Sequence, residues 1–164
     1  MELEFSRPVD VARLGAATAT YNLAAKPEER AALAKRFGLV SLDRLEAKIE
    51  LKRIPGGMVR LDAAMRADLV QSCVVTLDPV PAAIEEEFTL LYGDVEEDNA
   101  ALDPDAEPVE PIEDGRIDLG EAVAQQLSLS LDPYPRSPAA LAEAPPSETK
   151  DSPFAALAKL RQMK

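Results

Sequence analysis

The sequence predicts an α+β fold built on a curved, barrel-like antiparallel sheet with two main helices, an acidic mobile loop and a flexible C-terminal tail. Apolar and charged residues alternate over 42–53 and 59–69, and the alternation returns over 82–93. This period of two is typical of half-buried strands. Two further segments, 27–37 and 119–131, have apolar residues at helical spacing instead. Successive antiparallel strands with a helix between the early ones indicate an α+β meander.

Composition excludes several kinds of chemistry. The chain has 164 residues, no His, no Trp and one Cys, Cys73. A His-based triad, a His metal ligand, an intramolecular disulfide and a multi-cysteine zinc site are therefore excluded. The N-terminus opens with charges rather than as a signal peptide, and no apolar run approaches the length of about 18 residues that a membrane helix needs. We expect a soluble cytoplasmic protein without a metal, cofactor or small-molecule substrate.

The N-terminal part predicts two short strands and a helix. Segments 1–6 and 18–25 have the pattern of short strands. Pro27 suits the first turn of a helix, and Gly38 suits the left-handed conformation that ends one. The sequence therefore predicts a helix over 27–37.

The two alternating segments that follow predict a β-hairpin with a three-residue turn at 54–56. In that register Glu50 lies opposite Arg60. Lys48 lies opposite Asp62, so the faces match and opposite charges pair. In the third alternating segment, a glutamate at position 86 interrupts the apolar face.

Residues 94–114 differ in composition from the rest. They include ten acids, three prolines and no Lys or Arg, a composition that predicts a mobile loop. Asp118 then stands three residues before Glu121, a spacing typical of a helix start. We expect one domain over 1–132, followed by a Pro-rich linker at 133–153 and a short basic amphipathic tail at 154–164.

Several segments together resemble one bacterial family. They are YNLAAKPEERAALAKRFGLVSLDRLEAKIELKR, VQSCVVTLDPV with EEEFTLLY after it, EPIEDGRIDLGEAVAQQLSLSLDPYPR and the closing SPFAALAKL. They are similar to the YceD family, the large ribosomal RNA subunit accumulation proteins, and the ending resembles the alphaproteobacterial branch of that family. The resemblance implies a non-enzymatic role in ribosome biogenesis that supports normal levels of 23S ribosomal RNA.

The Cys73 segment departs from the family pattern. Many members have a Cys-x-x-Cys there and further cysteines near the Pro-rich end, which suggests a metal. This chain has Cys73-Val74-Val75-Thr76 and no later cysteine, so we do not carry a metal site across. The thiol lies in an apolar run without a neighbouring cation, and we expect it to pack as a small hydrophobe.

Basic residues on the polar side of the hairpin and in the tail are candidates for RNA contact. The chain has a net charge of −12, so binding to a polyanion would need local basic clusters. Acids share the hairpin face, and a self-paired surface is the alternative interpretation. The tail is either a helix that forms on binding or a frayed terminus. The candidate RNA-contact residues are Arg44, Lys48, Lys52, Arg60, Arg66, Lys159, Arg161 and Lys164.

The acidic segment suggests contact with a basic large-subunit ribosomal protein, with a merely solubilising loop as the alternative. The candidate residues are Asp94, Glu96, Glu97, Asp98, Asp103, Asp105, Glu107, Glu110, Glu113 and Asp114.

Two functions stay open at this stage. One is an assembly factor that binds 23S rRNA precursors or the proteins bound to them. The other is an acidic holder for a basic ribosomal protein, without direct RNA contact. A hydrolase that uses paired carboxylates is disfavoured, because acids in a mobile loop lack the preorganisation that catalysis requires.

Overall fold

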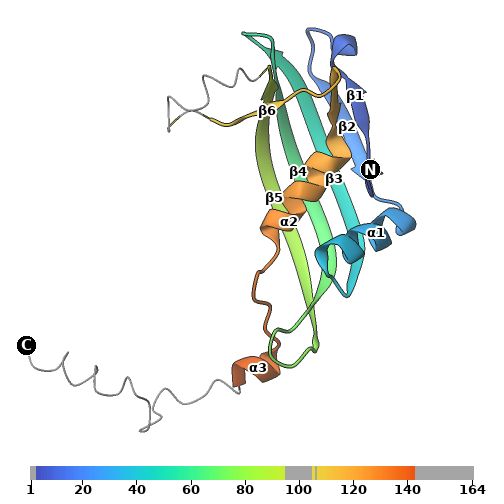
Figure 1. Ribbon diagram of the computed structural model, residues 1–164, viewed down its shortest axis with the longest axis vertical. Helices are drawn as coiled ribbons and strands as arrows, with labels where there is room; N and C mark the ends of the chain where they lie inside the picture. Colours follow the sequence, from blue (N-terminus) through green and yellow to red (C-terminus); the bar gives the residue numbers. More distant parts are fainter. Residues whose placement is uncertain (1–2, 95–104, 106, 143–164) are drawn as a thin grey trace, which may run out of the picture.

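The computed structural model describes residues 3–94, 105 and 107–142, and its main feature is a long, curved sheet with helices packed against it (Figure 1). A separate two-stranded pair joins β1 (Pro8–Asp10) to β7 (Arg116–Asp118). The main sheet has the spatial order β2-β3-β4-β5-β6, antiparallel except for the parallel β5 and β6. Its strands are β2 (Ala19–Ala24), β3 (Ser41–Ile54), β4 (Met58–Ser72), β5 (Pro79–Gly93) and β6 (Val109–Pro111).

The sheet is open, so the expected barrel-like closure is wrong. β2 and β6 lie at opposite edges of the sheet and do not pair with each other. Helices α1 (Pro27–Phe37) and α2 (Leu119–Ser130) pack on the inner face instead, and their side chains join its apolar cluster. The helices thus bury the face that strand closure would bury in a barrel. The α+β class and the mainly antiparallel pairing are confirmed.

One apolar cluster lies between the inner face and the two helices. The predicted alternation is confirmed, because Leu45, Ile49 and Leu61 are fully buried while the charged residues between them face outward. Leu33 from α1 and Leu127 from α2 complete the cluster, and both have no exposed surface. Each layer therefore buries one apolar face and leaves the other polar.

Glu86 interrupts the inner face of β5, as the sequence indicates, and α2 supplies its partners. Its carboxylate accepts hydrogen bonds from the Gln126 side chain at 3.0 Å and from the Ser130 hydroxyl. A polar group that is partly buried needs such partners to offset its lost hydration. This contact fixes the C-terminal end of α2 against β5.

Both predicted helices are confirmed, and the second ends one residue earlier than expected. In α1, the Glu29 carboxylate accepts a hydrogen bond from the N–H of Lys26 at 2.8 Å, and Gly38 ends the helix with a φ of 65°. In α2, the Asp118 carboxylate accepts from the N–H of Glu121 at 3.1 Å. Among the described residues, no helix is long and apolar enough to span a membrane.

The β3–β4 hairpin forms, but the predicted register is wrong by two residues. The turn contains residues 55–57, and both Gly56 and Gly57 have positive φ, 90° and 73°. Only glycine adopts such angles readily, so both glycines belong inside the turn. A shift of the register by two residues keeps the buried faces unchanged but brings like charges opposite each other. On the outer face, Glu50 now lies opposite Asp62 and Lys52 opposite Arg60.

A buried phenylalanine, rather than strand pairing, anchors the start of the chain. Residues 3–6, the described part of the strand expected at 1–6, form no strand. Phe5 is 1% exposed and packs in the core. Its backbone approaches α2 so closely that a Cβ on Gly120 would lie 2.4 Å from the Phe5 carbonyl oxygen. This close packing therefore requires a residue without a side chain at position 120.

The C-terminal half has more structure than expected. Strand β6 lies inside 94–114, where we expected only a mobile loop, and it extends the sheet beside β5. A short helix, α3 (Pro138–Ala142), lies inside 133–153, where we expected extended linker. The amphipathic helix expected at 154–164 lies outside the described residues.

We expect Gly120→Ala to lower the free energy of unfolding by about 1–3 kcal/mol, because the added methyl group meets backbone that cannot move away. Urea denaturation at pH 7 would measure the change. Gly15→Ala is the matched control, because no atom lies within 4 Å of a Cβ placed there. Equal effects of the two substitutions would show that the approach of Phe5 to α2 does not limit residue 120.

Candidate functional site

The structure brings the five hairpin cations together on one surface. Arg44, Lys48 and Lys52 come from β3, and Arg60 and Arg66 come from β4. All five are exposed. Strand residues two apart share a face, so these side chains lie on the side of the sheet away from the helices.

Acids on the same face neutralise the three arginines of this group. The hydrogen bond to Glu46 raises the pKa of Arg44, which stays charged. The side chains of Lys48 and Lys52, by contrast, form no ion pair or hydrogen bond with any residue in the described part of the chain. The ion pairs join Arg44 to Glu46 at 2.9 Å, Arg60 to Asp62 at 3.0 Å and Arg66 to Glu85 at 3.3 Å.

The outer face is hollowed along its middle. A depression of about 620 Å³ adjoins a second one of about 400 Å³, and Lys48, Ala64 and Glu87 line both. We call the two together the outer trough. The outer-face acids in the lining of the trough are Glu46, Glu50, Asp62, Glu85 and Glu87, and the cations there are Lys48 and Arg66. Because acids outnumber cations, this lining suits cationic groups better than phosphates.

A hollow of about 420 Å³ lies on the inner side, beside α2, and we call it the acidic groove. Leu90, Tyr92 and Leu129 form part of its apolar lining. Burial raises the pKa of Tyr92 to about 12, and the nearby carboxylates of Glu110 and Asp118 add to the shift. The acids that line the groove are Glu110, Glu113, Asp114, Asp118 and Glu121, and the cation Arg116 lies among them.

Sequence reasoning singled out three of these acids but missed the apolar lining. Glu110, Glu113 and Asp114 belong to the acidic segment, so composition alone identifies them. The apolar residues come from β5 and α2, which are distant in the sequence and meet only in the folded chain. In the sequence, the signal for this lining is the alternation of apolar residues in β5, which includes Leu90 and Tyr92.

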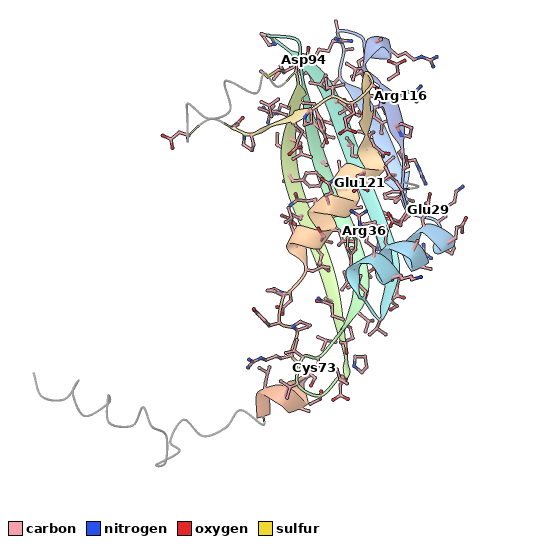
Figure 2. The ribbon with its side chains drawn as sticks, viewed as in Figure 1. Glu29, Arg36, Cys73, Asp94, Arg116 and Glu121 are labelled. Carbon is pink, nitrogen blue, oxygen red and sulfur yellow. The ribbon has the colours of Figure 1, made fainter. Side chains whose placement is uncertain are left out.

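The remaining candidates do not gather into a site within the described residues. Asp94, Asp105 and Glu107 are exposed, and Figure 2 shows Asp94 at the far end of the sheet from Cys73. The others lie outside the described residues: the acids Glu96, Glu97, Asp98 and Asp103, and the tail cations Lys159, Arg161 and Lys164.

Cys73 is buried, as expected, but it does more than pack as a hydrophobe. Its sulfur accepts hydrogen bonds from the N–H groups of Val75 and Thr76, each at 3.4 Å, and of Ser137 at 3.3 Å. The N–H of Val74 donates to the carbonyl of Pro135 at 2.9 Å. The Cys73 turn, residues 73–78, thereby holds the chain that follows α2 at the end of the sheet, next to α3 (Figure 2).

These contacts change the acidity of the thiol. Burial of the sulfur raises the pKa of Cys73, but the hydrogen-bond donors around it lower the pKa and together outweigh the effect of burial. The N–H of Ser137 lowers the pKa most, followed by the side chain and N–H of Thr76 and by the N–H of Val75. The result is a pKa of about 6, against an ordinary value of 9.0.

The same cluster does not fit the metal that the family pattern suggests. The structure does bring the Cys73 turn and the Pro-rich end together, and the positions that meet are Cys73, Thr76 and Ser137. The two hydroxyls lie 3.2 Å apart, and Thr76 also donates to Asp78 at 2.8 Å. One sulfur and two neutral hydroxyls are a poor donor set for a structural zinc ion. In the described ranges, no group of Cys, Asp and Glu could hold a metal.

Two bidentate arginine–carboxylate pairs join separate elements of the fold. Arg7 contacts Glu29 at 2.8 and 3.0 Å, and this hydrogen bond lowers the pKa of Glu29. Arg36 of α1 contacts Glu121 of α2 at 2.9 and 3.1 Å. Both residues are labelled in Figure 2. The pairs tie the two helices and the N-terminal segment together.

We expect Cys73 to make the stability of the protein depend on pH. A pKa that is lower in the folded state than in the unfolded state adds stability above the unfolded pKa, and this stability is lost as the pH falls through the folded pKa. The difference in unfolding free energy between the wild type and Cys73→Ala should therefore be largest near pH 9 and smallest near pH 6. Urea denaturation under reducing conditions would measure it, and a difference that is constant across this range would contradict the hydrogen-bonded thiolate.

Comparison with known proteins identifies the family. The family model described as "Large ribosomal RNA subunit accumulation protein YceD" matches residues 61–161, more than half of the chain. Searches of the curated proteins and of the solved structures find no match. The matched region includes most of β4, all of β5 and α2, and the Cys73 turn, and it continues into the tail. The chain therefore belongs to the YceD family of large ribosomal RNA subunit accumulation proteins.

Proposed function

We propose that the chain supports 23S rRNA accumulation and large-subunit assembly as a binding protein rather than as an enzyme. The family description ties it to large-subunit rRNA accumulation. Acid–base catalysis needs a carboxyl group whose pKa is shifted in a protected site. The acids of the outer trough are instead open to solvent or held in surface ion pairs, which supports a binding role.

The contact best supported is with a basic large-subunit ribosomal protein bound to the pre-ribosomal RNA. The observation that carries this proposal is the acidic lining of both the outer trough and the acidic groove. Clustered Lys and Arg on a ribosomal protein would be attracted to these surfaces, with an affinity that falls as salt rises. A holder that binds the same protein before it meets RNA would use the same surfaces.

Direct RNA contact is a second candidate, favoured by one local feature. Lys52 lies directly opposite Arg60 across the strands, and Lys48 is unpaired among the described residues. The two lysines make a small cationic patch on a face whose arginines are paired with acids. Clustered cations that release counterions from phosphates are the usual basis of such binding.

Capture from growing cells would test the protein contact. The tagged chain is recovered with and without ribonuclease, and ribosomal proteins and 23S precursors are measured together. We expect one basic ribosomal protein to stay bound after ribonuclease, and Glu50→Gln with Glu87→Gln to reduce its retention about threefold to tenfold. Glu28→Gln with Asp43→Asn removes the same charge at exposed positions outside the trough and the groove and serves as the control. Loss of every ribosomal protein on ribonuclease treatment would contradict the proposal.

A separate measurement addresses the RNA candidate. If RNA is bound directly, Lys48→Glu with Lys52→Glu should weaken binding of purified protein to a 23S rRNA fragment. The slope of log affinity against log salt should then fall by about 2, one for each phosphate that the variant no longer neutralises. Lys35→Glu on α1 is the control for a charge reversal away from the sheet. An unchanged affinity in the double variant would leave only the protein contact.

A further inference from the structure

The acidic groove combines an apolar floor with charges that have no partner. Leu129 is 78% exposed although it lies in the last turn of α2, and Leu90 and Tyr92 of β5 are only partly buried. Exposed leucine beside a half-buried apolar strand costs free energy, since about 25 cal/mol is lost for each Å² of apolar surface left in water. A surface of this kind is typical of a site that another segment covers.

Acids line the other end of the groove, and three of them have unpaired side chains among the described residues. Asp118 and Glu121 are occupied, because the first caps α2 and the second pairs with Arg36. Glu110, Glu113 and Asp114 have no side-chain hydrogen bond or ion pair with any residue in the described ranges. The groove therefore runs from exposed leucine at the C-terminal end of α2 to unpaired carboxylates near its N-terminal end.

The C-terminal segment of the chain has the complementary chemistry. Residues 154–164, FAALAKLRQMK, have apolar side chains in their first part and cations toward their end. On a helix, Phe154, Leu157 and Leu160 would share one side. The three cations Lys159, Arg161 and Lys164 would meet three unpaired acids and one cation, Arg116, in the groove lining, so acids outnumber cations there. A helix of this length is marginal alone and needs a surface to stabilise it.

We propose that residues 154–164 bind in the acidic groove of their own chain as an amphipathic helix. The apolar side chains cover Leu90, Tyr92 and Leu129, and the cations approach Glu110 and its neighbours. The segment runs antiparallel to α2, because Phe154 enters at the end near Leu129. This docking does not rest on the proposed ribosomal contact, but a basic protein that binds the groove would have to displace the segment, whereas the outer trough stays free.

The chain is long enough for this contact. At most about 34 Å of chain separates Ser130 from Ala142, counting an extended stretch followed by the short helix α3. The twelve steps from Ala142 to Phe154 span about 42 Å when extended. The connecting segment can thus return to the end of α2 without strain. Because the segment is tethered, docking is intramolecular and benefits from a high effective concentration.

Docking would withdraw the tail cations from other partners. Lys159, Arg161 and Lys164 would face carboxylates of the groove, so RNA or an acidic surface would have to compete for them. High salt would weaken the docked state by screening the charges.

A single tryptophan tests the proposal in the full-length chain. The chain has no Trp, so Phe154→Trp creates one fluorescent reporter at the start of the segment. We expect a blue-shifted emission and poor access to acrylamide at low salt, with a shift toward exposed tryptophan at 1 M salt, where the Debye length is about 3 Å. Tryptophan that is fully exposed at low salt would overturn the proposal.

Groove variants establish where the tryptophan lies. In the reporter chain, Glu110→Gln, Glu113→Gln and Asp114→Asn together should lower the ratio of docked to free segment about tenfold, given three surface charge pairs. Asparagine tolerates the positive φ of residue 114. The control combines Glu28→Gln, Glu50→Gln and Glu87→Gln, which remove the same charge outside the groove, and we expect no change.

Two further outcomes would also overturn the proposal. A buried tryptophan that ignores the groove variants would place the segment elsewhere, for example on the exposed leucine and valines of the Cys73 turn. A burial that disappears on dilution, together with a dimer in analytical ultracentrifugation, would mean that the segment binds the groove of a second copy.

Discussion

The Asp118 carboxylate is the interaction on which the placement of α2 depends. It accepts hydrogen bonds from the N–H of Glu121, from the N–H of Arg7 at 2.8 Å and from the Ser6 hydroxyl. One side chain thus caps the helix, ends β7 and holds the N-terminal segment. Because Gly120 lets the Phe5 backbone lie against the helix, α2 crosses the inner face at one position only. The core beneath the helix and the groove beside it both follow from that position.

Much of the fold could be predicted because the informative signals are local. Alternation identified β3, β4 and β5, and the spacing from Asp118 to Glu121 identified the start of α2. The hairpin register failed because the choice between a turn at 54–56 and one at 55–57 depends on backbone angles at two adjacent glycines. Charge pairing favoured the wrong register, which shows that surface ion pairs are weaker determinants than glycine geometry.

The site was less predictable, for a physical reason. A stripe of cations along a strand can be identified from the sequence, but their neutralisation by Glu46, Asp62 and Glu85 depends on side-chain positions. Closure into a barrel depends equally on contacts between distant segments, and helices that cover the inner face make it unnecessary. The hydrogen bond from Ser137 to Cys73 joins residues 64 apart, a contact that no local pattern indicates. The features of the site that sequence reasoning missed are thus formed by distant segments, whereas the hairpin register was missed for a local reason.

The short reach of β6 has a consequence for the behaviour of the protein in concentrated solution. β6 pairs only with residues 91–93, so in the described structure the rest of the outer edge of β5 has no neighbouring strand. Exposed edges are templates for aggregation, and proteins protect them with prolines and charges. Here Pro79 and Pro81 remove two donors, and the exposed Glu85 and Glu87 add charge beside the edge. The edge therefore resists edge-to-edge assembly although the sheet never closes.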